Sequence, residues 1–263
     1  MRLMRFRHHG HLHTGVLRGA GVVAIRSDLL SIVRSGVLPQ EPAGPAIPLA
    51  EVEPALPYDV PPKIWCIGLN YKSHAEDIQA QQPEEPGSFM KPASCMFEPG
   101  GDIVLPPPDI STDVDAEGEL GVIIGRKCRG LSESETPGAI FGYTTTLDLT
   151  ALDVLRKNPR YLTRAKSIDT FFSFGPVVVT ADEIPAVDDL EVITEHNGEV
   201  WSRDFVRNMR HRPFDLIRFH SRFMTLYPGD LISTGCPKGA RINPGDRVAA
   251  RIDGVGRLDA NVT

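Results

Sequence analysis

Residues 113–125 read DVDAEGELGVIIG and join alternating carboxylates to an apolar run. The apolar part, 119–125, predicts a buried strand. Side chains alternate between the two faces of a strand, so Asp115, Glu117 and Glu119 project from one side. Carboxylates two residues apart have Cα atoms roughly 6 to 7 Å apart, so their oxygens can converge on one cation. The stretch predicts a core strand with a candidate metal site; on spacing alone, a solvated acidic strand end is an equal alternative.

A second strand supplies a further carboxylate. The segment FGYTTTL at 141–147 predicts a strand, and Asp148 follows it directly. An acid buried at a strand end needs a partner, because an unpaired buried charge is costly. Asp148 is therefore the expected third metal ligand.

The segment KIWCIG at 63–68 predicts a strand, and the polar residues after it predict a helix that includes residues 71–78. On such a helix His74 and Asp77 lie at i and i+3, so the carboxylate can orient the imidazole and raise its basicity. This is a general-base dyad in outline. A purely structural histidine is the alternative reading.

The chain divides at a proline-rich stretch. Residues 1–38 predict short antiparallel strands and a helical turn at 29–33. Eight prolines then fall between Pro39 and Pro62, which predicts an extended linker. We expect a small N-terminal β-rich domain with its linker at 1–58 and a catalytic domain at 59–263, in an α+β, mainly β class.

Other elements follow from local patterns. Asn197-Gly198 is a strong type I′ hairpin signal between strands at 190–195 and 199–202. The remaining expectations are a lid within 76–90 around PEEPG, a strand at 89–91, and helices at 133–140 and 212–225.

Composition excludes several classes of protein. The chain has 263 residues, 41% of them hydrophobic, and a formal net charge of -6 without a basic block, which argues against disorder and against a nucleic-acid partner. Its longest apolar run, 120–125, is far shorter than the roughly 20 residues that span a bilayer, so no membrane partner is expected. The first residues lack the pattern of a signal peptide, and four cysteines stand without a CxxC pair. We therefore expect a cytoplasmic protein with reduced, mostly buried thiols.

Several motifs occur in a recognisable order: IGLNYKSHAED, FMKP, DAEGELGVIIGRKCRG, FGYTTTLDLTALD, RAKSIDTF, FGP, NGEVWS and LYPGDLISTGCPKG. In this order, across roughly residues 63–250, the chain resembles the fumarylacetoacetate hydrolase family. The resemblance implies a β-roll main domain of that family's type, a small N-terminal β-rich domain, a homodimer, and a divalent cation, Mg²⁺ or Mn²⁺.

The resemblance also assigns roles to individual positions. It places the metal carboxylates on Glu117, Glu119 and Asp148, and it leaves Asp115 outside the ligand set. It places the catalytic histidine on His74, a catalytic lysine on Lys166 and a substrate-binding lysine on Lys91. Lysines near a developing enolate supply fixed positive charge.

Four positions depart from the family pattern. Leu152 and Leu155 stand where the family commonly has an arginine and a glutamine that hold substrate oxygens, so we expect these leucines to favour a bulkier or less charged substrate. Asp77 replaces a glutamate in the dyad. Cys236 replaces the threonine of a T-G-T-P turn and is expected to be a buried turn thiol, while Thr234 beside it is a candidate substrate contact.

The resemblance and the residues together predict a divalent-metal-dependent hydrolase that cleaves a carbon–carbon bond in a β-diketone or acylpyruvate-like oxo acid. A non-hydrolytic member, meaning an isomerase, decarboxylase or cyclase for a less polar oxo compound, is the enzyme alternative. A catalytically silent homologue that binds an oxo acid or another protein is the third hypothesis.

Overall fold

The computed structural model describes the chain except residues 41, 43 and 78 and the side chain of Asp77. The strands are β1 Arg2–His8, β2 His11–Arg18, β3 Gly21–Ile25, β4 Ile47–Pro48, β5 Glu53–Ala55, β6 Ile64–Gly68, β7 Gly87–Lys91, β8 Asp102–Ile103, β9 Val114–Ile124, β10 Ile140–Ala151, β11 Phe172–Phe174, β12 Val177–Thr180, β13 Glu191–His196, β14 Glu199–Phe205, β15 Leu231–Ser233, β16 Ala240–Arg241, β17 Arg247–Ile252 and β18 Gly256–Val262. The α-helices are α1 Leu29–Ser35, α2 Lys72–Asp77, α3 Leu152–Lys157, α4 Leu162–Lys166 and α5 Pro213–Phe223. Short 3₁₀ helices are η1 Leu49–Glu51, η2 Ala93–Cys95, η3 Pro137–Ala139, η4 Ala181–Glu183, η5 Val187–Asp189 and η6 Val206–Asn208.

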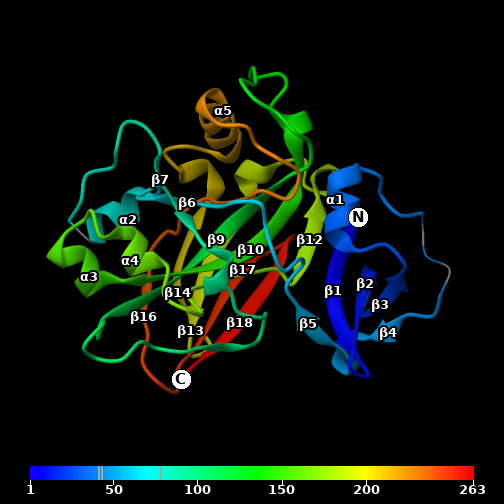
Figure 1. Cartoon of the computed structure of the whole chain (residues 1–263), viewed down its shortest axis with the longest axis horizontal. Coiled ribbons are helices and arrows are strands. Elements are labelled where there is room, and N and C mark those ends of the chain that lie inside the picture. The colour runs from blue at the N-terminus through cyan, green and yellow to red at the C-terminus, as the bar shows by residue number, and fades with distance from the viewer. Residues whose placement is uncertain (41, 43, 78) are drawn as a thin grey trace.

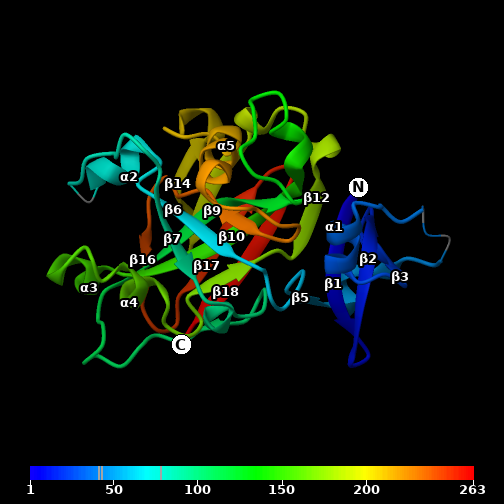
Figure 2. The ribbon, with the colours of Figure 1, turned by 45° about the horizontal axis from the view of Figure 1, so that its top comes forward.

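Two sheets carry the fold (Figure 1). In the described residues the larger sheet has 13 strands along the order β4-β3-β2-β1-β12-β10-β9-β15-β6-β7, with β5, β11 and β16 attached to its sides. The smaller sheet has the order β14-β13-β17-β18-β8. The long antiparallel pair β9 and β10 lies at the middle of the molecule in both Figure 1 and Figure 2. The mainly β prediction is confirmed.

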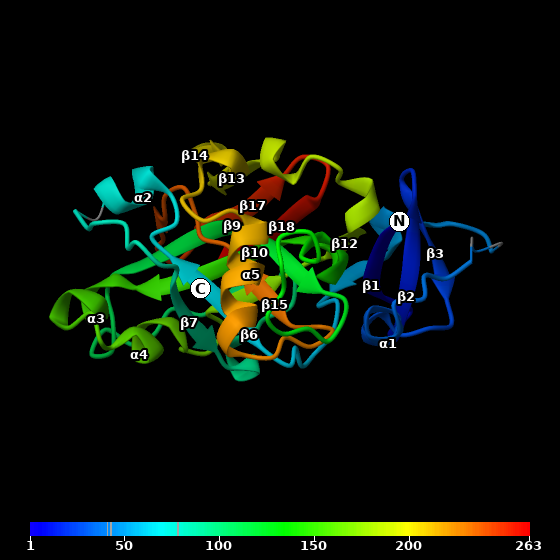
Figure 3. The same ribbon diagram turned by 90° about the horizontal axis from the view of Figure 1, so that it is seen from above.

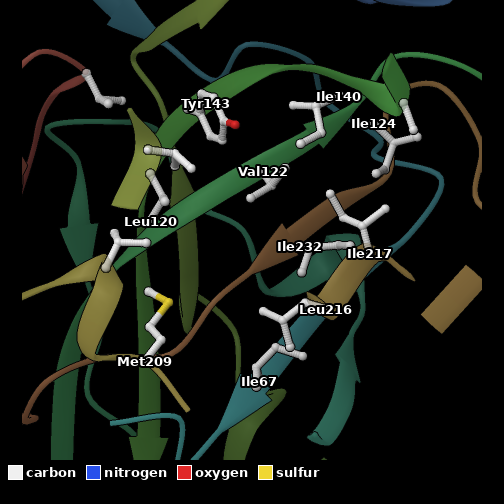
Figure 4. Close-up of a cluster of buried hydrophobic side chains, with 14 of the residues drawn as sticks. Ile67, Leu120, Val122, Ile124, Ile140, Tyr143, Met209, Leu216, Ile217 and Ile232 are labelled. Atoms are coloured by element: carbon white, nitrogen blue, oxygen red, sulfur yellow. The ribbon is translucent and has the colours of Figure 1, made fainter. Parts of the chain in front are cut away.

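The two faces of β9 have different neighbours. Leu120, Val122 and Ile124 point into an apolar cluster that includes Leu216 and Ile217 of α5 (Figure 4). Helix α5 lies across the strands of the large sheet when the molecule is seen from above (Figure 3). The other face carries the odd-numbered residues, among them Glu117 and Glu119, because side chains alternate along a strand. Packing on one face therefore fixes which carboxylates lie on the other.

The N-terminal strands extend the large sheet. Strand β1 pairs antiparallel with β2 and β12, and β5 of the predicted linker pairs with β1. Met4 and Phe6 of β1 form a separate small buried cluster with Val22 of β3. The division at residue 58 stays a prediction. None of the described helices is long and apolar enough to cross a membrane.

The structure tests several local predictions directly. Helix α2, strand β7 and helix α5 lie where the sequence predicts a helix, a strand and an amphipathic helix. All four cysteines are free and buried, as expected. The helix predicted at 133–140 is wrong, since the regular elements described there are η3 and the first residue of β10, in a segment where Pro137 and Gly138 disfavour an α-helix.

The two central strands are longer than their apolar runs predict. The acidic residues from Asp115 to Glu119 lie inside β9, not before it. Asp148 lies inside β10, not after its end. The polar residues belong to the strands because backbone pairing continues through them, with Asp148 directly opposite Glu117.

The predicted turn at Asn197-Gly198 contacts the turn that carries Asp246 at one end of the smaller sheet. Asn197 has φ 53° and Gly198 has φ 84°, as the predicted type I′ turn requires. The Asp246 carboxylate, from a PGD turn, accepts hydrogen bonds from the Asn197 side-chain amide at 2.9 Å and the Asn243 N–H at 2.8 Å. These bonds, with His196 beside them, hold the pKa of Asp246 at about 2, below its usual 3.8.

Gly118→Ala should destabilise the fold by about 1 to 3 kcal/mol, since overpacking forces neighbours apart. A Cβ at residue 118 would lie 2.7 Å from Thr194 Oγ1 and 3.2 Å from Ala250 Cβ, both in the smaller sheet. Urea unfolding measures the change. Gly138→Ala is the matched control, since nothing lies within 4 Å of its added methyl group. Equal stability of the two variants would contradict this packing.

Asp246→Asn should lower the free energy of unfolding by about 1 kcal/mol near neutral pH, because an ionised acceptor is lost. The folded-state pKa of Asp246 is depressed, so its contribution is present above the unfolded value of 3.8 and disappears as pH falls towards about 2. The deficit of the variant should shrink over that window in urea titrations. A deficit independent of pH would argue against the carboxylate as its source.

Candidate metal centre

Three buried carboxylates converge because of strand register. Asp148 of β10 lies directly opposite Glu117 of β9, and Glu119 lies one same-face position further along β9. Oxygens of Glu117, Glu119 and Asp148 all lie within 4.8 Å of one another. The three residues are 5%, 1% and 1% exposed, so water does not screen their mutual repulsion.

Hydroxyl groups fix two of these carboxylates. Thr150 donates to Glu117 Oε1 at 2.6 Å. Ser233 donates to Glu119 Oε2 at 2.5 Å, and the backbone N–H of Gly235 donates to the same oxygen at 2.8 Å. The carboxylates are therefore held in place before any ligand binds.

Two buried lysines oppose part of the negative charge. Lys166 Nζ lies 2.8 Å from Glu117 Oε2 and 2.9 Å from Asp148 Oδ2. Lys91 Nζ lies 2.6 Å from Asp148 Oδ1 and also donates to the carbonyls of Leu149, Lys166 and Phe171. No lysine in the described residues forms an ion pair with Glu119.

The pKa values of the carboxylates and of Lys166 follow from this distribution of charge. Burial, and then the charges of Asp148 and Glu117, raise the pKa of Glu119 to about 8. Burial alone would raise the pKa of Glu117, but the charges of Lys166 and His74 outweigh it and lower that pKa. Burial alone would lower the pKa of Lys166, but Asp148, Glu117 and Glu119 outweigh it and raise that pKa. In this balance Glu119 is the carboxylate that the lysines compensate least.

This donor set fits a hard divalent cation. Mg²⁺ and Mn²⁺ prefer carboxylate oxygens, and Glu117, Glu119 and Asp148 provide three of them, buried and close together. A divalent cation would also neutralise the charge that raises the pKa of Glu119. Asp115, on the same strand face, lies 3.3 Å from Arg241 Nε and is not in the group.

His74 lies at the other side of Glu117. A ring nitrogen of His74, an oxygen of Glu117 and the sulfur of Cys236 lie within 4.8 Å of one another. Burial, and then the charges of Glu117 and Glu119, raise the pKa of the Cys236 thiol well above its usual value. The Asp77 carboxylate lies outside the described part of the chain, so the predicted dyad with His74 stays a prediction.

The other candidate residues lie around this centre. Leu152 begins α3 and is buried, and Leu155 is partly buried against a cluster that includes Val154 and Phe171. The Thr234 hydroxyl donates to the carbonyl of Leu120 at 2.8 Å. Roles for these residues and for Lys91 in substrate binding stay predictions. The predicted lid, 76–90, includes residues 77 and 78, which are not fully described.

Sequence reasoning missed several contributors. Thr146, Thr150, Ser233 and Asn70 are all buried, and the first three bond directly or through one another to the carboxylates. Thr146 and Thr150 lie two residues on either side of Asp148, so the two-residue period of a strand could have indicated them. Nothing local to Ser233 indicates its contact with Glu119, which is 114 residues away.

Comparison with known proteins identifies the family. Residues 63–263 match the model described as fumarylacetoacetate (FAA) hydrolase C-terminal. The match covers most of the chain, and the chain belongs to the fumarylacetoacetate hydrolase family. Hydrolases, isomerases and tautomerases are all found among its relatives, so membership defines a class of enzyme but not one reaction.

Three relatives illustrate this range. Human mitochondrial oxaloacetate tautomerase FAHD2B is 34% identical over 236 residues, covering 86% of this chain and 74% of its own. The 5-carboxymethyl-2-hydroxymuconate delta-isomerase from Mycobacterium smegmatis has a TM-score of 0.83 and 31% identity, covering 100% of this chain and 98% of its own. Maleylpyruvate hydrolase from Sphingobium sp. SYK-6, in complex with manganese (II) ion and pyruvate, has a TM-score of 0.81 and 27% identity, covering 100% and 99%.

Glu119→Gln should leave the metal-free protein at least as stable as the wild type, because burial and the neighbouring carboxylates already disfavour the ionised form of Glu119 and the amide oxygen can still accept from Ser233 and Gly235. At 100 times its Kd, Mg²⁺ should stabilise the folded wild type by about 2.7 kcal/mol and so raise its melting temperature. The melting temperature of the variant should not change. Thermal unfolding with Mg²⁺ or chelator measures both effects.

Asp115→Asn is the matched control for that experiment, since Asp115 lies on the same face of β9 but outside the carboxylate group. This variant should keep its response to Mg²⁺. An equal response in Glu119→Gln would remove Glu119 from the ligand set.

Proposed function

We propose that this protein is a divalent-metal-dependent hydrolase that cleaves a carbon–carbon bond in a β-diketone or acylpyruvate-like oxo acid. The observation that carries the proposal is the group of three buried carboxylates with His74 and Lys166 against it. We propose Mg²⁺, with Mn²⁺ as the alternative, as the cation held by Glu117, Glu119 and Asp148. Such a cation would act as a Lewis acid towards adjacent substrate oxygens.

The side chains divide the remaining chemistry. His74, oriented by Asp77, would accept a proton from the water that attacks the remote carbonyl. Lys166, whose ammonium group already lies against two carboxylates, would stabilise the negative charge that develops on the leaving enolate. Lys91 holds Asp148 through a 2.6 Å ion pair, so its first contribution is to position a ligand.

The substrate pocket would be less polar than that of a typical family member. Leu152 and Leu155 supply no hydrogen-bond donor where an arginine and a glutamine would hold a carboxylate. A carboxylate tail would therefore lose contacts worth a few kcal/mol, and we propose a bulkier, less charged tail, with Thr234 as a further contact. We also propose a cytoplasmic homodimer, in keeping with the family resemblance.

Isomerisation of an oxo acid is the second candidate. The observation that favours it is the 34% identity to a protein named oxaloacetate tautomerase. In that reaction His74 would take the proton from a carbon next to a carbonyl instead of from water, and the developing enolate would meet the same Lys166.

Loss of enol absorbance across a panel of acylpyruvates and β-diketones with polar and apolar tails tests the proposal. Turnover should require Mg²⁺, stop with a chelator, and be fastest for apolar tails. His74→Gln should lower kcat by about 10² to 10⁴, the usual contribution of a general base. Glu76→Gln is the matched control, because Glu76 lies on the same helix with a side chain 66% exposed.

Heavy-oxygen water separates the two candidates. Incorporation of ¹⁸O into a product acid would establish hydrolysis, because the attacking oxygen stays in that product. Enol loss without cleavage would assign isomerisation instead. Unchanged kcat in His74→Gln would remove His74 as the base in either reaction.

A further inference from the structure

A second group of metal-binding side chains lies beside the carboxylate group. It consists of His74, Glu117 and Cys236, whose ligand atoms lie within 4.8 Å of one another. The three residues are 9%, 5% and 2% exposed. Glu117 is the one residue that both groups contain, so two cations with different ligand preferences would compete for it.

Hydrogen bonds from side chains to the backbone hold the segments that carry His74 and Cys236 together. Ser73, next to His74, donates its hydroxyl to the carbonyl of Pro237, next to Cys236, at 2.9 Å. The side-chain amide of Asn70 donates to the carbonyl of Thr234 at 2.7 Å. These two bonds tie the start of α2 and the residue before Tyr71 to the turn that carries Cys236, so the fold brings the backbone of His74 close to that of Cys236.

Gly235 allows this close approach. Its φ of +95° is in the region that favours glycine, and a Cβ there would lie 2.9 Å from Asn70 Cβ. The turn can therefore pack directly against the first residues of the helix segment. The backbone positions of the group are therefore set before a cation binds.

The chemistry of this group differs from that of the carboxylate group. Imidazole nitrogen, carboxylate oxygen and thiolate sulfur are the ligands of zinc, and three protein ligands leave a fourth tetrahedral position open. Bond lengths of about 2.0 to 2.3 Å place tetrahedral ligand atoms about 3.5 Å apart, which small side-chain rotations reach from the present separation. Mg²⁺ prefers an all-oxygen set and gains little from imidazole or sulfur.

We propose that His74, Glu117 and Cys236 form a binding site for a thiophilic divalent cation of the Zn²⁺ type, and that its occupancy inhibits the enzyme. The Cys236 proton passes to solvent when the sulfur binds the cation. A coordinated His74 nitrogen can no longer accept a proton, and Glu117 is withdrawn from the carboxylate group. Inhibition rests on the proposed function of His74, whereas cation binding does not.

Cobalt (II), a spectroscopic substitute for Zn²⁺, tests binding directly. Titration of the wild-type protein with Co²⁺ should produce the near-ultraviolet thiolate-to-cobalt charge-transfer band at one equivalent, in the presence of excess Mg²⁺. Cys236→Thr, which places the family's usual residue in the turn, should abolish the band. Cys236→Ser provides a second variant if the first does not fold, and gel filtration with circular dichroism checks both.

Two controls assign the band. Cys66 also lies near Asp148 and Glu119, as its charge interactions with them indicate, so Cys66→Ala should keep the band. Glu119→Gln should keep it too, since Glu119 belongs only to the carboxylate group. A band lost in Cys66→Ala but kept in Cys236→Thr, or no thiolate band in the wild type, would overturn the proposed site.

Zinc inhibition tests the consequence separately. With a substrate that the enzyme turns over, micromolar Zn²⁺ should inhibit the wild type at saturating Mg²⁺, and the inhibition constant should rise at least about tenfold in Cys236→Thr relative to that variant's own zinc-free rate. A tenfold change corresponds to about 1.4 kcal/mol. A thiolate band without inhibition would keep the site and overturn its inhibitory effect. If no substrate is found, the cobalt band still decides the site.

Discussion

The structure depends on the placement of three carboxylates on adjacent strands in the interior. Register puts Asp148 directly across from Glu117, an arrangement that is unfavourable for like charges unless a cation lies between them. Lys166 and Lys91 compensate part of this charge from α4 and β7. In the described part of the chain Glu119 has hydrogen-bond donors but forms no ion pair with a lysine, and this imbalance is the physical reason to expect a divalent cation.

The rest of the fold keeps these carboxylates in position. The opposite face of β9 is packed under α5 and the smaller sheet, and Gly118 allows the two sheets to approach at the level of the ligands. A strand fixed on its apolar face cannot slip by one residue without moving every carboxylate into the core. The packing of the apolar face of β9 therefore fixes the positions of the carboxylates on its other face.

We expect the residues around the metal centre to select which reaction a member of this family catalyses. The proposed metal carboxylates and the proposed role of Lys166 would suit hydrolysis, isomerisation and tautomerisation, because each passes through negative charge next to a carbonyl. The proposed substrate contacts Leu152 and Leu155, together with Cys236, are the positions where we expect this chain to differ from other members in its choice of substrate or reaction. Cys236 also brings a soft ligand beside a hard site, which couples the two kinds of cation through Glu117.

The sequence by itself determined the mainly β class, the alternation that aligns Glu117 with Glu119, and the hairpin at Asn197, because these features follow from a local period or a local turn. Local patterns also indicated Asp148 and His74 as candidates, and the resemblance added Lys166. The helix expected at 133–140 does not form, because Pro137 and Gly138 disfavour an α-helix there. Only the tertiary structure decided that Ser233 bonds to Glu119 and that Cys236 lies beside His74, because contacts between residues more than a hundred positions apart depend on strand pairing and packing, which no local pattern encodes.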